Sequence, residues 1–269
     1  MKIPNPIFPK EHGAWAVLFI PLICGVSYAK QFSMDSIFIV LASLSFFLAY
    51  VPMQYLLKSI IKKSLTREKI FQSAFWATIY ASAGIIFFLP IILKGNVEIA
   101  FIGIIAAVFF ALNFLWTMHH PKTIVGDLLA VAGLTLSAPL GYYAAGKTLY
   151  STAILLWCIH FLYFSGAVFY VHMKISAVSL KKNECNLAEK ISVGKYTIAY
   201  VIFSAILLAV LFSYTIISVG VLVAFVPLYV HCIYGTFMLS SEVHFKKVGF
   251  ALLFHSVFYA IIVGFFSMS

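Results

Sequence analysis

Long apolar runs follow one another along the whole chain, and only short polar segments separate them. A membrane-spanning helix needs about 20 mostly apolar residues. On that rule the pattern predicts about nine transmembrane helices, over residues 14–30, 33–57, 70–93, 97–117, 123–144, 150–172, 195–213, 215–238 and 247–267. The division between the seventh and eighth runs rests on Ser213, Tyr214 and Thr215, almost the only polar residues there, and we expect a tight hairpin at this point.

Composition supports the membrane assignment. Hydrophobic residues make up 63% of the 269 residues and charged residues 10%, whereas a soluble domain is about one quarter charged. No soluble-sized segment separates two runs, so we expect a single transmembrane domain over residues 1–269. No small-residue cleavage site follows the first run, which predicts a retained helix rather than a signal peptide.

Basic residues are distributed unequally between the two sets of connections. With the N-terminus inside, fifteen of the 18 Lys and Arg residues fall in inner segments, and three, Lys30, Lys94 and Lys147, fall in outer ones. Because Lys and Arg accumulate on the cytoplasmic side, we expect a multi-pass inner-membrane protein with a cytoplasmic N-terminus and, for nine helices, a C-terminus outside. This topology also accounts for the net charge of +10, and no aromatic and basic platform predicts a nucleic-acid partner.

The cysteines predict neither a disulfide framework nor structural zinc. Cys24, Cys158, Cys185 and Cys232 form no CxxC or Cys/His spacing. No metal site is assigned, and no cofactor or oligomeric state follows from the pattern.

The first candidate constellation is Lys10-Glu11-His12-Gly13-Ala14-Trp15, at the entrance of the first run. Glu11 and Trp15 are four residues apart and share a helix face. An ionisable residue within a membrane helix is a functional candidate by default. The alternative is an interfacial cap, in which the acid stabilises the helix N-terminus and the Trp anchors the headgroup level.

The second constellation lies between the fourth and fifth runs and contains His119, His120, Lys122 and Asp127. Asp127 is expected about one turn deeper than the interface, where a carboxylate requires a partner. The two His, Lys122 or His12 would supply it, and such a pair could transfer a proton or hold a cation. The alternative is a structural salt bridge.

Further candidates lie in the second half of the chain. His172 and Lys174 end the sixth run at the inner interface, where they could meet a phosphate-bearing substrate or only satisfy the charge bias. Glu242 and His244 precede the last run on the same side and could close a ring around a cytoplasmic opening. His160, His231 and His255 lie inside apolar runs, where a facing pair could ligate haem or each could bond to a neighbouring helix.

Three segments resemble the YwiC-like family of bacterial integral membrane proteins. They are Pro9-Lys10-Glu11-His12-Gly13-Ala14-Trp15, then Gly126-Asp127-Leu128-Leu129, then Leu136-Ser137-Ala138-Pro139-Leu140. The opening heptad is the most specific of the three.

Nine helices with long inner loops after the second and sixth are also similar to the UbiA superfamily of intramembrane prenyltransferases, which implies a UbiA-like helical bundle. Those enzymes hold Mg²⁺ and a prenyl diphosphate with two aspartate-rich motifs at the inner ends of these helices. Here residues 50–58 and 170–176 contain no acid. The comparison implies instead that Gln54, Lys58, His172 and Lys174 occupy the site, where the basic residues would bind an anionic headgroup directly.

The combined hypothesis is a UbiA-like membrane protein that acts at the cytoplasmic face on an isoprenoid or quinone-like lipid. Its chemistry would be that of a transferase or lipid-modifying enzyme similar to a prenyltransferase, without the aspartate-rich motifs. Glu11, His12 and Asp127 would be catalytic. The substrate-binding candidates are Lys10, Trp15, Gln54, Lys58, His119, His120, Lys122, His172, Lys174, Glu242 and His244. The alternatives are a non-enzymatic lipid or ion carrier and a haem-bearing electron-transfer subunit.

Overall fold

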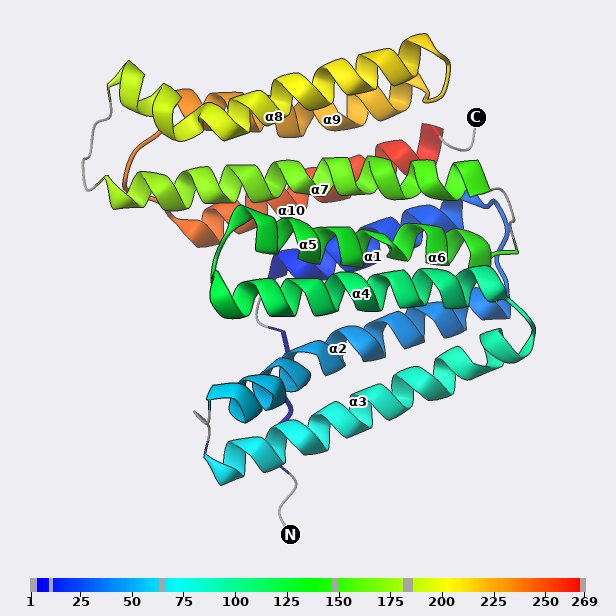
Figure 1. The fold of residues 1–269 in the computed structure, drawn as a ribbon. Coiled ribbons are helices and arrows are strands. Elements are labelled where there is room, and N and C mark those ends of the chain that lie inside the picture. Colours follow the sequence, from blue (N-terminus) through cyan, green and yellow to red (C-terminus); the bar gives the residue numbers. More distant parts are fainter. Residues whose placement is uncertain (1–3, 10–11, 63–65, 147–149, 181–185, 267–269) are drawn as a thin grey trace. The chain divides into compact units, whose positions relative to one another are not determined.

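The computed structural model describes residues 4–9, 12–62, 66–146, 150–180 and 186–266. Within these ranges every regular element is an α-helix (Figure 1), which confirms the all-α membrane fold. The helices are α1 (His12–Tyr28), α2 (Met34–Lys62), α3 (Arg67–Leu93), α4 (Val97–His119), α5 (Ile124–Thr135), α6 (Ser137–Ala144), α7 (Tyr150–Ser179), α8 (Leu187–Ser213), α9 (Val219–Phe237) and α10 (Phe245–Phe266).

The helices match the predicted runs closely in number and position. Among the described residues, eight segments are long and apolar enough to cross a membrane, with α5 and α6 counted together as Ile124–Ala144. A shorter apolar helix, Gly13–Tyr28, corresponds to the first predicted run, 14–30, and brings the total to nine. The protein is therefore a multi-pass membrane protein.

Local capping explains two boundaries that differ from the prediction. α8 begins eight residues before the predicted start because Asn186 and Glu189 form a capping box, each side chain accepting from the other's backbone N–H. α9 begins later than predicted, at Val219, because Thr215 takes a left-handed conformation (φ 55°) in the preceding turn.

The fifth predicted helix, 123–144, is wrong as a continuous element because it divides at Leu136 into α5 and α6. Pro139 has no backbone N–H to donate to the Thr135 carbonyl, four residues earlier, so this helical hydrogen bond is missing at the division. A proline is tolerated in the first turn of a new helix, and α6 restarts at Ser137.

The chain folds as two compact units, Met1–Ile154 and Leu155–Ser269, each of which is described by itself. The single domain expected from the sequence stays a prediction. Unit 1 contains α1 to α6, and unit 2 contains α7 from Leu155 onward with α8 to α10.

In unit 1, α6 packs against α1 at unusually close range. Gly25 lies directly against the Ala138 carbonyl, and a Cβ at Gly141 would lie 2.5 Å from the Leu22 carbonyl oxygen. Small residues let membrane helices approach backbone to backbone, which increases van der Waals contact where no hydrophobic driving force exists between helices. Ser137 adds a hydrogen bond from its hydroxyl to the Leu18 carbonyl, 2.8 Å.

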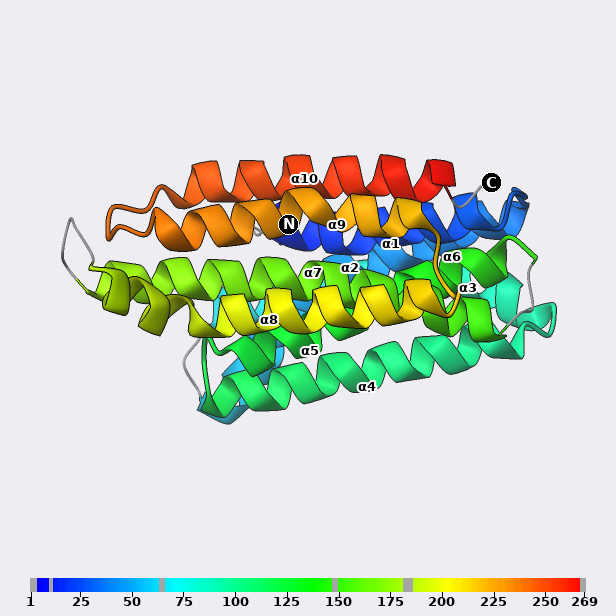
Figure 2. The same ribbon diagram turned by 90° about the horizontal axis from the view of Figure 1, so that it is seen from above.

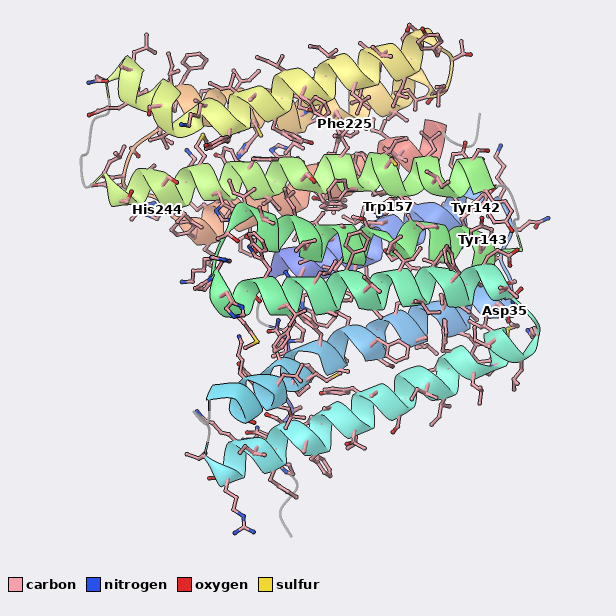
Figure 3. The ribbon with its side chains drawn as sticks, viewed as in Figure 1. Asp35, Tyr142, Tyr143, Trp157, Phe225 and His244 are labelled. Carbon is pink, nitrogen blue, oxygen red and sulfur yellow. The ribbon has the colours of Figure 1, made fainter. Side chains whose placement is uncertain are left out.

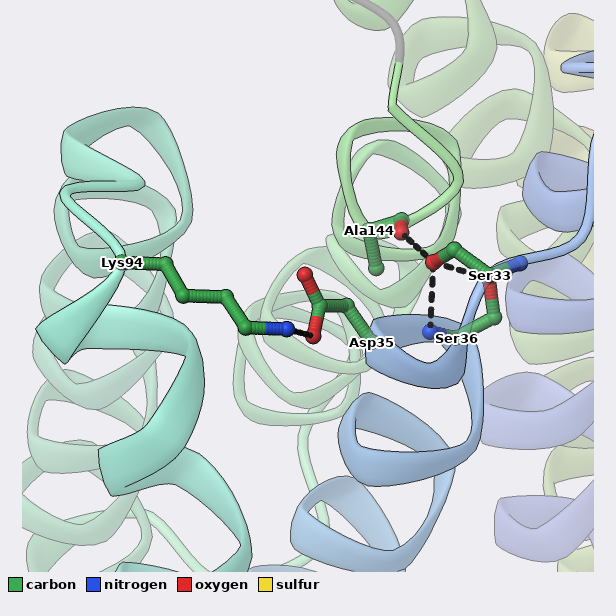
Figure 4. Close-up of polar contacts among 5 residues, drawn as sticks. All are labelled: Ser33, Asp35, Ser36, Lys94 and Ala144. Carbon is green, nitrogen blue, oxygen red and sulfur yellow. Dashed lines mark hydrogen bonds and ion pairs between the residues drawn. The ribbon is translucent and has the colours of Figure 1, made fainter.

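Polar contacts join the opposite helix ends of unit 1. Lys94 at the end of α3 forms a 2.5 Å ion pair with Asp35 in the first turn of α2 (Figure 4). Ser33 donates to the Ala144 carbonyl at the end of α6, 2.5 Å. The other end of unit 1 carries Lys58, Arg67, Lys69 and Lys122, and we call it the basic end.

In unit 2, α9 packs against both α8 and α10, as Figure 2 shows from above. Tyr200 on α8 donates to the Leu162 carbonyl on α7, and Thr197 donates to the Phe169 carbonyl, 3.1 Å. Phe225, which Figure 3 labels, is fully buried on α9. Aromatic and hydroxyl side chains therefore fill the interior of this unit.

Candidate functional site

The N-terminal constellation is described in part. Lys10 and Glu11 lie outside the described residues, as does the side chain of His12, the first residue of α1. Trp15 packs against Phe19 and Phe47 with ring centroids 6.0 and 5.1 Å apart, and its Nε1 donates to the Pro9 carbonyl, 3.4 Å. Trp15 thus belongs to the core cluster around Leu18 and also holds the segment that precedes α1.

A hydrogen-bonded chain joins three helices near the basic end. Gln54 on α2 donates to the Tyr50 hydroxyl, 2.6 Å, and Tyr50 donates to the Asn113 side-chain oxygen on α4. Asn113 in turn donates to the Gly126 carbonyl on α5, 2.5 Å. Sequence reasoning selected Gln54 and missed Tyr50 and Asn113. The available signal was the single amide at Asn113 within the apolar run of α4.

Asp127 is the next residue after Gly126, where the hydrogen-bonded chain ends, and lies in the first turn of α5. Thr123 caps the helix by accepting from the Gly126 N–H, 3.3 Å. A carboxylate in the first turn is stabilised by the helix dipole, and Asp127 is exposed. The ion partner expected for Asp127 stays a prediction.

His119 and His120 lie together at the end of a shallow groove between α4 and α5, of about 450 Å³. The lining residues are Leu112, Leu115, Trp116, His119, His120, Val125 and Leu129, which we call the α4–α5 groove. The Trp116 indole donates to the Thr123 hydroxyl, 2.8 Å, and its ring packs against His120 with centroids 5.0 Å apart. Lys122 is exposed in the adjoining loop and adopts a left-handed conformation (φ 58°).

The groove combines apolar walls with a polar end. Its α4 residues recur at helical spacing, and those from α5 are four residues apart, so each set shares a helix face. Leu115 is 56% exposed and Val125 44% exposed. In a membrane this face meets lipid chains, with the two His at the level where the helices end.

The remaining predicted residues are divided between the two units. Lys58 is half-buried on α2 in unit 1. Unit 2 holds His172 and Lys174 on α7, and the exposed Glu242 and His244 precede α10. Lys174 is buried and donates to the Gly235 carbonyl on α9, 2.9 Å.

The buried histidines of unit 2 each pack with aromatic neighbours. His160 lies edge-on against Tyr259, with ring centroids 5.5 Å apart. His231 contacts Tyr170 at 4.6 Å and His255 at 4.9 Å. The two histidines named for haem, His160 and His231, thus have separate ring partners. In the described ranges, no group of three or more His, Cys, Asp or Glu side chains is placed to hold a metal ion.

The arrangement was compared with known proteins. No curated protein and no solved structure matches the chain. The likeness to the UbiA superfamily stays a prediction. The model of the family described as YwiC-like protein matches residues 8–142, which is half of the chain and covers α1 to α5 and most of α6. The matched part includes the opening heptad, the Asn113 hydrogen-bonded chain and the α4–α5 groove, and the protein belongs to the YwiC-like family.

Proposed function

We propose that this protein binds an isoprenoid or quinone-like amphiphile in the α4–α5 groove, at the cytoplasmic face of the inner membrane. The observation that carries the proposal is the groove itself, whose apolar walls end at His119 and His120. An elongated lipid with a polar head likewise has a long apolar part and one polar end.

The energetics place selectivity at the polar end. Lipid tails are as apolar as the leucines of the wall, so moving a chain from bilayer to groove gains little from the hydrophobic effect. Hydrogen bonds to charged groups are worth about 1.5–3 kcal/mol each. His119, His120 and Lys122 are the groups that would supply them to an anionic or carbonyl-bearing headgroup.

The cytoplasmic assignment follows from charge. The groove's polar end belongs to the basic end of unit 1, where Lys58 lies in the last part of α2 and Arg67 and Lys69 lie in the first turn of α3. Positive residues accumulate on the cytoplasmic side of bacterial membrane proteins. The headgroup would therefore be exposed to cytoplasmic reactants.

Lipid modification by Glu11, His12 and Asp127 is the enzymatic form of this proposal. In that form, Glu11 and Asp127 would take the place of the missing aspartate-rich motifs. A non-enzymatic lipid carrier is the second candidate, and the position of Asp127 favours it. Val125 and Leu129 line the groove, whereas Asp127, two residues from each, is not among the lining residues, as expected for the other side of the helix.

Mass spectrometry of lipids that copurify with the protein tests the binding proposal. We expect enrichment of one isoprenoid or quinone-like lipid over an unrelated membrane protein from the same host. Val125→Trp should reduce that enrichment by about tenfold or more, a loss of at least about 1.4 kcal/mol, because the indole fills the groove.

Val108→Trp is the matched control. Val108 lies on α4, is 51% exposed and does not line the groove, so this variant should retain the lipid. Bulk phospholipid alone, or equal retention by both Trp variants, contradicts the proposal. In the same experiment, Asp127→Asn distinguishes the two forms: a chemically altered lipid population indicates an enzyme, and an unchanged one indicates a carrier.

A further inference from the structure

Unit 2 contains a column of titratable side chains along the inner faces of α7, α9 and α10. At one end Lys174 Nζ lies 5.3 Å from the centre of the Tyr170 ring. Tyr170 contacts His231, and His231 contacts His255, with ring centroids 4.6 and 4.9 Å apart. Lys174 and Tyr170 are one turn apart on α7, whereas Tyr170 and His231 are 61 positions apart and His231 and His255 are 24 positions apart on neighbouring helices.

The column continues one helical turn further along α10. Tyr259 follows His255 by four residues and stacks on Tyr163 with centroids 3.8 Å apart. The His160 ring lies edge-on against Tyr259, 5.5 Å away. The column therefore runs from Lys174 to His160, which are 14 positions and about 21 Å apart along α7.

The residues of α7 and α9 that lie side by side show how far the column, from Lys174 to His160, extends along α9. Lys174 is level with Gly235, and Tyr170 is level with His231. Continuing this register places Val219, the first residue of α9, level with residues 157–158 of α7. α9 has 19 residues and is about 28 Å long, so the column extends over most of the thickness that α9 crosses.

Several polar atoms in the column lack the hydrogen bonds that a purely structural role would require. His160 is fully buried, and its Nδ1 lies 2.7 Å from the Leu156 carbonyl oxygen. In the described part of the chain, His160 Nε2, His231 Nε2 and the Tyr163 hydroxyl are buried without a hydrogen-bond partner. Leaving a buried polar group unpaired is destabilising, whereas groups that only join helices are hydrogen-bonded.

We propose that the column from Lys174 to His160 is a proton-transfer path through unit 2. Ionisable residues inside membrane proteins mark proton relays. The histidines and the tyrosines of the column are both suited to such a relay. An imidazole accepts a proton on one ring nitrogen and releases another from the second. A phenol accepts a hydrogen bond on its oxygen while it donates its own proton. Each transfer moves one proton and no electrons, so no co-reactant is required.

The steps are short enough for this role. Ring contacts of 4.6–5.5 Å bring the polar edges within reach of side-chain rotation or of one bridging water. His255 and Tyr259 are one turn apart on α10, about 6 Å of helix rise. Among the described residues, Tyr200 on α8 and Tyr229 and Cys232 on α9 are further titratable groups in the bundle interior.

The path should select protons over other cations. No carboxylate belongs to the described column, and Lys174 stands at its basic end, where Lys190, Lys195, Lys246 and Lys247 also lie. Positive charge at an entrance repels K⁺ and Na⁺, but a proton moves along hydrogen bonds by exchange. The proposal concerns unit 2 alone and does not depend on lipid binding in unit 1.

Proton flux into liposomes containing the purified full-length protein and a trapped pH dye tests the path. With a membrane potential set by K⁺ and valinomycin, we expect wild-type flux at least about tenfold above that of protein-free liposomes. His231→Phe and Tyr170→Phe should each reduce flux to near the protein-free rate. Tyr170→Phe removes a single oxygen and keeps the ring packing, so it remains informative if His231→Phe does not fold.

Tyr234→Phe is the matched control because Tyr234 lies on α9 but is 62% exposed. Its flux should equal that of the wild type. Wild-type flux equal to the protein-free rate overturns the proposal, as does unchanged flux in a folded Tyr170→Phe variant. Loss of flux in Tyr234→Phe as well would also overturn it, because the effect would then not follow the column.

Discussion

Replacing Gly25 by alanine is expected to remove most of the folded protein from detergent extracts. The added methyl group would meet the Ala138 carbonyl oxygen, a backbone atom of α6 that no rotamer change can move. Overpacking typically costs about 1–3 kcal/mol. We expect the upper end of this range because the nearest atoms, the O, C and Cα of Ala138, are all backbone atoms. Separating α1 from α6 would also stretch the bond from Ser137 to the Leu18 carbonyl. Thermal unfolding followed by size-exclusion chromatography measures the loss.

Gly13→Ala, in the same helix, controls for the general effect of a glycine substitution. No described atom lies within 4 Å of a Cβ at Gly13. Alanine has a higher helix propensity than glycine, and Gly13 lies in the first turn of α1, so this variant should be at least as stable as the wild type. Equal stability of the two variants would show that α1 and α6 are not in close backbone contact.

Replacing Asn113 by leucine should destabilise unit 1 by about 2 kcal/mol, since two interhelical hydrogen bonds in a membrane protein are worth about 1–2 kcal/mol each at most. Asn113 is 4% exposed and connects Tyr50 on α2 to Gly126 on α5. Without it the Gly126 carbonyl loses its side-chain donor. Because Gly126 lies in the first turn of the helix that forms one wall of the groove, lipid retention should fall together with the midpoint of thermal unfolding.

Asn96→Leu is the matched control for this prediction. Asn96 is the N-cap of α4 and makes no side-chain capping hydrogen bond. Its replacement should change stability by less than about 0.5 kcal/mol. If Asn113→Leu has as small an effect as Asn96→Leu, the hydrogen-bonded chain does not hold α5 in place.

Hydrophobic patterning was sufficient to predict where the helices lie, because apolar length alone decides which segments can cross a bilayer. It did not predict the division at Leu136, since both halves, α5 and α6, are apolar. Pro139 removes one backbone hydrogen bond there, but α1, α2, α3 and α9 each continue through a proline, so a proline alone does not indicate a break. The close approach at Gly25 and Gly141 was also beyond the pattern, because it depends on which two helices become neighbours.

The candidate site was predictable only where its residues are neighbours in sequence. His119, His120 and Lys122 form one segment, and the structure places the two His at one groove. Tyr50 and Asn113 were missed because they are 63 positions apart and neither is ionised at neutral pH. A charge-based search favours Lys and Glu, whereas a membrane interior selects neutral hydrogen-bonding groups.

The proposed set of substrate-binding residues includes members of both units, such as Gln54 in unit 1 and Lys174 in unit 2. That they form one site stays a prediction. Within its own unit, Lys174 contacts Tyr170 and Gly235.

Site-specific photo-crosslinking in native membranes is the most direct test of lipid binding by the groove. A benzophenone amino acid would replace Leu115, which lines the groove, or Val108, which lies two turns away on the same helix. Mass spectrometry would then identify the lipid attached at each position. We predict an isoprenoid or quinone-like adduct at position 115 and only bulk phospholipid at position 108. The same phospholipid adducts at both positions would contradict the proposal.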